Sequence, residues 1–332
     1  MPDARHAGAG RHCRSGFSRD WSGLKPLLRS AAFAGLTLLL AAPASAAEPR
    51  EPGPVRQMTP ALLWSLLPGG GHFYLGDPVT GATYASLTAA FLATGAEVQR
   101  RNDALGREDE VNVAAIIGEK VWEYSIFTTF RESARRAGVD LRAAGFDDTP
   151  TATLLLAPFD PGQFLRPTVF GAALLGIAGA ALAAEDREGG RLTDVERARM
   201  LGSEFDRDDA TALYGLSAFG VSMGAGAAEE GLFRGVLQPI LQDRWGRSGG
   251  LWAASGIFGA AHLVGVDGEL NAGGALFATA AGAYFGWMYN RDGNRLAGPI
   301  AAHFWYDFMI FAATWALEPD DTPFGFDVEF QF

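Results

Sequence analysis

The chain has 332 residues, of which 48% are hydrophobic and 20% are charged, and its mean hydropathy is +0.06. This composition fits apolar membrane spans joined by polar loops better than a uniformly soluble enzyme. The formal net charge of −11 argues against nucleic acid as a partner. The only cysteine, Cys13, lies in a segment that we expect to be removed, which excludes disulfides, thiolate metal sites and a cysteine nucleophile from the rest of the chain.

Residues 1–46 are predicted to be a signal peptide. Basic residues precede the apolar stretch AAFAGLTLLLAA (31–42), and PASA (43–46) then places small residues at the positions that a signal peptidase recognises. The apolar stretch is short for a membrane-spanning helix, which favours cleavage near Ala46 over retention as an anchor.

Residues 47–110 are predicted to form an N-terminal membrane hairpin. Two apolar segments flank the turn PGGGHFYLG (68–76), which resembles the Pro-Gly-x-Gly-Gln-x-Tyr-x-Gly hairpin of many small bacterial membrane proteins, with His72 in place of the glutamine. A structural turn, in which the glycines allow close approach, is favoured over a catalytic role for His72.

Residues 111–164 are predicted to contain an amphipathic helix and a linker. Apolar and aromatic side chains recur at helical spacing over residues 112–137, which end in several arginines. We expect this helix to lie on or under the membrane surface, with its aromatic residues in packing or interface roles: Trp122, Tyr124, Phe127 and Phe130. No chemistry is predicted here.

Residues 165–317 contain the apolar, Gly- and Ala-rich segments that are candidates for membrane spans: 168–184, 211–228, 250–266, 272–289 and 296–317. The polar insert at 185–209 is expected to be a solvated loop or a short surface helix, and the tail at 318–332 a strand or an amphipathic segment. The predicted fold class is therefore all-α: a polytopic membrane helix bundle with an N-terminal signal peptide and an N-terminal helical hairpin. We expect a multi-pass protein surrounded by lipid in a bacterial inner membrane.

Polar side chains interrupt three of these apolar segments. Residues four apart share one helix face, which pairs Glu230 with Arg234, Phe258 with His262, and His303 with Asp307; Glu229 precedes the first pair. Such faces are unfavourable toward lipid, so they are expected to turn toward one another or toward a wet cavity.

The three motifs EEGLFR (229–234), FGAAH (258–262) and HFWYD (303–307) carry a family resemblance. In this order they resemble the Glu-Glu-x-x-x-Arg, Phe-x-x-x-His and His-x-x-x-Asn/Asp motifs of the CPBP family of intramembrane proteases, which includes the CAAX-processing endopeptidases. The resemblance covers roughly residues 165–317 and departs at Asp307, where CAAX-processing members have Asn and bacterial relatives can have Asp. It implies an intramembrane endopeptidase acting on protein or peptide substrates that include membrane-anchored ones. No cofactor is expected, with Zn²⁺ as the alternative. The site residues that it implies are Glu229, Glu230, Arg234, His262, His303 and Asp307.

The residue types fit peptide hydrolysis. A carboxylate in a poorly solvated cavity is a stronger base than one in water, so Glu229 can activate water and His262 can help to position it. His303, oriented by Asp307, can donate to the developing oxyanion. Glu230 and Arg234 are expected to form the ion pair that makes the charged segment tolerable. The assignment of the first glutamate as base follows the family pattern.

Three other functions compete with this one. A rhomboid-like serine protease would use Ser255 with His303 as base, although Ser255 also fits a small packing residue. A zinc protease would use Glu229, His262 and His303 as ligands, although no His-Glu-x-x-His stretch supports it. A non-catalytic membrane scaffold or transporter would use the same charges in a polar path.

Overall fold

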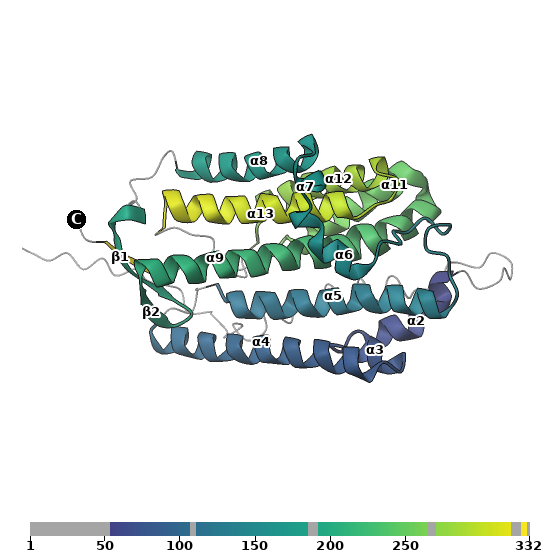
Figure 1. Cartoon of the computed structure of the whole chain (residues 1–332), viewed down its shortest axis with the longest axis horizontal. Coiled ribbons are helices and arrows are strands. Elements are labelled where there is room, and N and C mark those ends of the chain that lie inside the picture. Colours follow the sequence, from purple (N-terminus) through teal and green to yellow (C-terminus); the bar gives the residue numbers. More distant parts are fainter. Residues whose placement is uncertain (1–53, 107–110, 185–191, 265–269, 320–326, 331–332) are drawn as a thin grey trace, which may run out of the picture.

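The computed structural model describes residues 54–106, 111–184, 192–264, 270–319 and 327–330, and helices predominate among them. The predicted signal peptide lies outside these residues. Figure 1 shows the long helices α8, α13, α9, α5 and α4 side by side, and helices that are neighbours in this order contact one another. The described part of the chain is therefore the helix bundle that the sequence predicted.

The N-terminal part folds as three helices that pack on a fourth. They are α2 (Pro54–Trp64), α3 (Gly70–Tyr74) and α4 (Pro78–Ala104), and the fourth is α5 (Val113–Arg136). His72 of α3 is buried, with its Nε2 2.9 Å from the hydroxyl oxygen of Thr128 on α5 and its ring stacked on Tyr84 of α4 at 5.4 Å. These contacts support the structural role predicted for the turn. A membrane-spanning hairpin at 47–110 stays a prediction.

Helix α5 does not lie at the edge of the molecule, where an amphipathic surface helix would be expected. It packs between α4 and α9 (Figure 1) and also contacts α2. Phe127 and Phe130 on this helix are each 1% exposed and belong to the main hydrophobic core. The aromatic spacing was correctly interpreted as packing, but the packing partners are other helices of this chain.

Short helices lead from α5 to the first apolar helix of the second portion. They are α6 (Thr151–Leu156), η1 (Ala157–Phe159) and α7 (Pro161–Phe164), and they are followed by α8 (Pro167–Ala184). The indole Nε1–H of Trp305 donates a 2.8 Å hydrogen bond to the carbonyl oxygen of Pro158. This contact ties the connection to helix α13.

The polar insert contains a small sheet, which corrects both its assignment as loop or surface helix and the purely all-α class. After η2 (Leu192–Asp194), strands β1 (Val195–Met200) and β2 (Ser203–Asp206) form an antiparallel hairpin, and β3 (Asp327–Phe330) pairs with the other edge of β1. Leu201 and Gly202 between the strands both have positive φ, 53° and 72°, as the tight two-residue hairpin turn requires. Buried Ala198 and Met200 anchor β1 on the bundle. The strand predicted as one alternative for the C-terminal tail is present in β3.

The remaining elements form a helical run that carries the candidate site, followed by two further helices. The run comprises α9 (Arg207–Gly224), η3 (Ala225–Glu229), α10 (Glu230–Leu232), η4 (Phe233–Leu237) and α11 (Gln238–Ala261). Both η3 and η4 are π-helical turns. Gly246, with φ of 75°, kinks α11. Helices α12 (Ala272–Arg291) and α13 (Ala297–Leu317) complete the bundle.

Two helices of the described residues are long and apolar enough to cross a membrane. These are α8, with a mean hydropathy of 1.8, and α13, with a mean hydropathy of 1.2. They correspond to the first and last of the five predicted spans. The other three segments are helical, except that the helix of the segment 250–266 ends at Ala261. Membrane crossing by these three stays a prediction.

Helices α8 and α13 pack closely because a glycine lies at their contact. Gly176 of α8 is buried, and a Cβ added to it would overlap the carbonyl oxygen of Tyr306 on α13. Small residues let membrane helices approach in this way. Since Tyr306 lies between His303 and Asp307, this contact fixes the part of α13 that carries candidate site residues.

Replacing Gly176 with alanine is expected to lower the melting temperature in detergent, because overpacking of this kind costs about 1–3 kcal/mol. The matched control is Gly171→Ala on the same helix, where an added Cβ would meet nothing within 4 Å. Equal melting temperatures for Gly176→Ala and the unchanged protein would contradict the close approach of the two helices.

Candidate active site

The structure brings together all six site residues predicted from the sequence. Glu229 ends η3, Glu230 begins α10 and Arg234 lies in η4, while His262 directly follows α11 and His303 and Asp307 project from α13. Two π-helical turns flank α10, and this helix irregularity often occurs at functional sites. Successive residues of a helix point in different directions, so the two adjacent glutamates face different neighbours.

The centre of the site is a buried ion pair shared with a histidine. Nη1 of Arg234 donates to Oε1 of Glu230 at 2.9 Å, and Nδ1 of His303 lies 2.9 Å from the same oxygen. Glu230 and Arg234 are both 0% exposed. The predicted pair of Glu230 and Arg234 is therefore present, and it also holds His303.

The guanidinium group of Arg234 is surrounded by groups that suit a buried cation. Its Nη2 donates a 2.9 Å hydrogen bond to the carbonyl oxygen of Gly282 on α12. The guanidinium carbon lies 4.4 Å from the centre of the Phe258 ring, in cation–π geometry. Because a Cβ at Gly282 would lie 2.9 Å from Nη2, only glycine allows this approach without displacing the arginine.

Glu229 faces a different set of partners. Its Oε1 lies 2.8 Å from Nζ of Lys120 on α5, and its Oε2 lies 4.0 Å from Nε2 of His262. Among the described residues Oε2 has no hydrogen-bond partner, although it is buried. Nδ1 of His262 donates to the carbonyl oxygen of Phe258 at 2.8 Å, which leaves Nε2 as the ring nitrogen that faces Glu229.

His303 is oriented chiefly by Glu230 and not by Asp307. Its Nδ1 is at hydrogen-bond distance from Glu230, whereas its Nε2 lies 3.5 Å from Oδ2 of Asp307. The ring stacks on Phe285 of α12, with centroids 4.8 Å apart and an interplanar angle of 19°. Asp307 therefore adds a nearby negative charge, while Glu230 and Phe285 set the direction of the ring.

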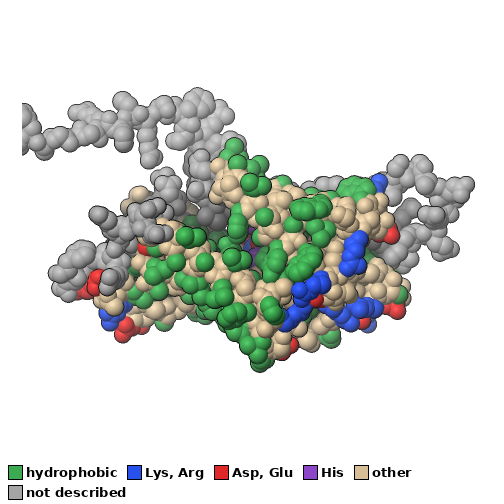
Figure 2. All heavy atoms as spheres, turned by 90° about the horizontal axis from the view of Figure 1, so that it is seen from above, with side chains coloured by type: hydrophobic (Ala, Val, Ile, Leu, Met, Phe, Trp, Pro, Cys, Tyr) green, Lys and Arg blue, Asp and Glu red, His purple; other side chains and the backbone are tan. Residues whose placement is uncertain are grey.

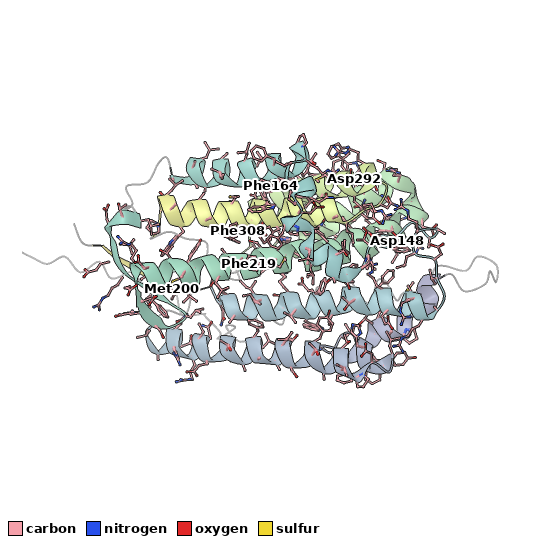
Figure 3. All side chains as sticks on the ribbon, in the orientation of Figure 1. Asp148, Phe164, Met200, Phe219, Asp292 and Phe308 are labelled. Carbon is pink, nitrogen blue, oxygen red and sulfur yellow. The ribbon has the colours of Figure 1, made fainter. Side chains whose placement is uncertain are left out.

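Close helix packing keeps these side chains in place. A Cβ on Gly231 would lie 2.7 Å from the Phe127 ring of α5, and one on Gly226 would lie 2.9 Å from the carbonyl oxygen of Ile300 on α13. The ring of Phe304, next to His303, contacts Phe219 and Phe308, which lie along the line where α9 and α13 meet (Figure 3). The segment that carries the two glutamates therefore packs tightly between α5 and α13.

One side of the site is accessible. The side chain of His262 is 40% exposed and that of Asp307 is 18% exposed, whereas that of Glu229 is 8% exposed. Figure 2 shows a face of the molecule on which hydrophobic side chains surround a hollow where histidine atoms are visible. The ion pair of Glu230 and Arg234 is therefore the most deeply buried part of the site, Glu229 and His303 are also buried, and His262 lies toward solvent.

Lys120 and Glu123 were missed by sequence reasoning. They lie on α5, a segment for which no chemistry was predicted, and Lys120 contacts both Glu123 and Glu229. A signal was present, because the printed sequence contains only one other lysine, Lys25, among 27 basic residues. A lone lysine inside an apolar, aromatic helix points to a buried carboxylate partner.

The geometry bears on two of the competing functions. Ser255 is 1% exposed and its hydroxyl donates to the carbonyl oxygen of Leu251 at 2.8 Å, which fits a packing residue. No group of three or more His, Cys, Asp or Glu side chains within the described ranges is arranged to hold a metal ion.

Comparison with known proteins identifies the segment that carries this site. Residues 211–309 match the family model described as type II CAAX prenyl endopeptidase Rce1-like, and this segment includes all six predicted site residues. A search of the curated proteins found no match, and a search of the solved structures found none either. This match confirms the resemblance inferred from the three motifs: residues 211–309 are similar to the Rce1-like type II CAAX endopeptidases of the CPBP family.

Proposed function

We propose that this protein is an intramembrane endopeptidase that hydrolyses peptide bonds with water activated by Glu229. The observation that carries the proposal is the 4.0 Å separation between Oε2 of Glu229 and Nε2 of His262, a buried carboxylate oxygen facing an imidazole nitrogen. One water at about 2.8 Å from each atom fits this gap. The family match supports a protease, and the glutamate mechanism is our assignment.

In this mechanism Glu229 takes a proton from the water as its oxygen attacks the peptide carbonyl carbon. Negative charge then develops on the carbonyl oxygen, and Nε2–H of His303 donates to it. This step needs a hydrogen on each ring nitrogen of His303, and the carboxylates of Glu230 and Asp307 lie 2.9 Å from Nδ1 and 3.5 Å from Nε2. When the C–N bond breaks, Glu229 returns the proton to the leaving amine, so the carboxylate is regenerated.

Glu230 and Arg234 have a supporting role in this proposal. They are fully buried behind the histidines and bind groups of this chain: His303 and the carbonyl oxygen of Gly282. The substrate is proposed to be a protein or peptide at the membrane, with hydrolysis at the exposed side of the site. Placement in a bacterial inner membrane stays a prediction from the sequence.

Glu229→Gln, His262→Ala and His303→Ala are each expected to abolish cleavage of a peptide library by the purified protein in detergent, because the three groups act as one unit. Unchanged melting temperatures would show that these variants lose activity through the missing side chain and not through unfolding. Full activity in any one variant would remove that residue from the mechanism. Inactivity of the unchanged protein on all peptides, with lipid present, would instead favour the scaffold or transporter.

Ser255→Ala is expected to retain most of the activity, because the hydroxyl is engaged with its own helix. Serine-directed phosphonates are expected not to label the protein, and a chelator is expected not to reduce cleavage. Covalent labelling at Ser255 together with an inactive Ser255→Ala variant would overturn the glutamate mechanism in favour of a rhomboid-like one. Loss of activity with chelator and recovery with Zn²⁺ would favour the zinc protease.

Glu230→Gln or Arg234→Met is expected to lower the yield of folded protein and its melting temperature. Either change leaves a buried charge without its partner, which costs about 3–5 kcal/mol. The double neutral variant is expected to recover part of this loss, as a coupled pair does. If both single variants fold normally but cleave no peptide, Glu230 and Arg234 take part in the catalytic reaction and do not merely support its residues.

A further inference from the structure

A buried chain of charges on α5 reaches the proposed base from outside the segment that matches the family. Nζ of Lys120 lies 2.8 Å from Oε1 of Glu229 and 2.9 Å from Oε2 of Glu123. The side chains of Lys120, Glu123 and Glu229 are 12%, 2% and 8% exposed. Buried charges at these distances interact far more strongly than exposed ones.

The position of the ammonium group is fixed from two sides. Glu123 lies three residues further on α5, so one helix holds both groups, and its two carboxylate oxygens lie 2.9 and 3.0 Å from Nζ. On the other side, a Cβ added to Gly224 of α9 would lie 2.6 Å from Cβ of Lys120, so the two helices approach closely at this lysine. A compact ammonium suits this space and can donate to two carboxylates at once, which a planar guanidinium does less well.

The composition of the chain points the same way. Arginine supplies all but two of its 27 basic residues, yet the residue at this buried position is lysine. The other lysine, Lys25, lies in the predicted signal peptide. The lysine at position 120 therefore goes against the chain's own preference for arginine, as expected where the shape of the cation matters.

We propose that Lys120 is a positioning residue of the active site, which holds Oε1 of Glu229 so that Oε2 faces His262 and the reacting water. Glu123 in turn fixes Lys120. This inference rests on the proposed function and deepens it, because it assigns part of the catalytic geometry to a helix outside residues 211–309. Although burial alone would raise the pKa of Glu229, the ammonium group of Lys120 lowers it below its usual range. The carboxylate therefore stays ionised, which corrects the expectation that burial makes Glu229 a stronger base.

Other charged groups surround Glu229, and the test has to separate their effects from that of Lys120. From the elements packed around it they are Glu119 and Glu123 on α5, Glu230 and Arg234 on α10 and η4, His262 after α11, and His303 and Asp307 on α13. Among these groups, Lys120 makes the closest contact with Glu229 in the described structure.

The decisive variants are Lys120→Met and Glu123→Gln, assayed for cleavage as a function of pH. Lys120→Met is expected to lower kcat about 10²-fold with little change in KM, because a displaced base loses its alignment. The acidic limb of its kcat profile is expected to move to higher pH by about 1–3 units, because the carboxylate loses its neighbouring cation. Burial raises the pKa of Glu123 to about 8, so this group is protonated over the acidic limb. Glu123→Gln is therefore expected to lower kcat by loosening Lys120 while the acidic limb stays in place.

Two further variants separate positioning from folding. Lys120→Arg keeps the charge but not the shape, so kcat is expected to fall while the acidic limb stays in place. The control is Arg131→Met on the same helix, whose guanidinium donates to the carbonyl oxygens of Asp147 and Thr149. It is expected to lower the melting temperature without moving the acidic limb. If Lys120→Met does not fold, Glu123→Gln and Lys120→Arg still decide the question.

A measurement that does not depend on activity separates this inference from the proposed function. A diazo reagent esterifies carboxylic acids in their protonated form, and mass spectrometry then gives the extent of modification at Glu229. In Lys120→Met this modification is expected to extend to higher pH than in the unchanged protein. If the unchanged protein cleaves no peptide but this shift is present, proteolysis is wrong while the Lys120–Glu229 pair stands. If neither the acidic limb nor the modification moves, the positioning role is wrong even where Glu229→Gln is inactive.

Discussion

The buried pair of Glu230 and Arg234 is the interaction on which the rest of the site depends. Two opposite charges four residues apart on one helical run need partners in this interior, and neighbouring helices supply several of them. Helix α13 brings His303 to Glu230, and α12 brings a backbone carbonyl and an aromatic face to Arg234. The pair therefore determines how three helices must meet, and the orientation of His303 follows from it.

The packing around this pair explains the glycines and the irregular helix. Gly226, Gly231 and Gly282 each lie where a neighbouring side chain or backbone would collide with a Cβ. The segment contains two π-helical turns, and within it Glu229 faces α5 while Glu230 faces α13. At the start of α13, a carboxylate oxygen of Asp147 accepts a 2.5 Å hydrogen bond from the backbone N–H of Leu296, so a distant loop fixes the helix that carries His303.

The sequence predicts those parts of the site that depend on residue spacing within one helix. The pairing of Glu230 with Arg234 follows from residues four apart, as does the shared face of Phe258 and His262. It could not reach contacts between helices distant in the chain, such as Lys120 with Glu229, because helical periodicity carries no information about which faces meet. For the same reason His303 was assigned to its local neighbour Asp307, whereas its closer partner is Glu230. The strands of the polar insert were missed because their exposed charged residues masked the short buried pattern of β1.

The small sheet limits which membrane topologies are possible for the chain. Strand β1 follows α8 and strand β3 follows α13, and the two strands are hydrogen-bonded to each other. Hydrogen-bonded strands must share one aqueous compartment. With α8 and α13 as spans, both helices therefore cross the bilayer in the same direction, and the chain between them crosses it an odd number of times. A single accessible label in β2 thus reports the compartment of the C-terminal strand and the orientation of both helices.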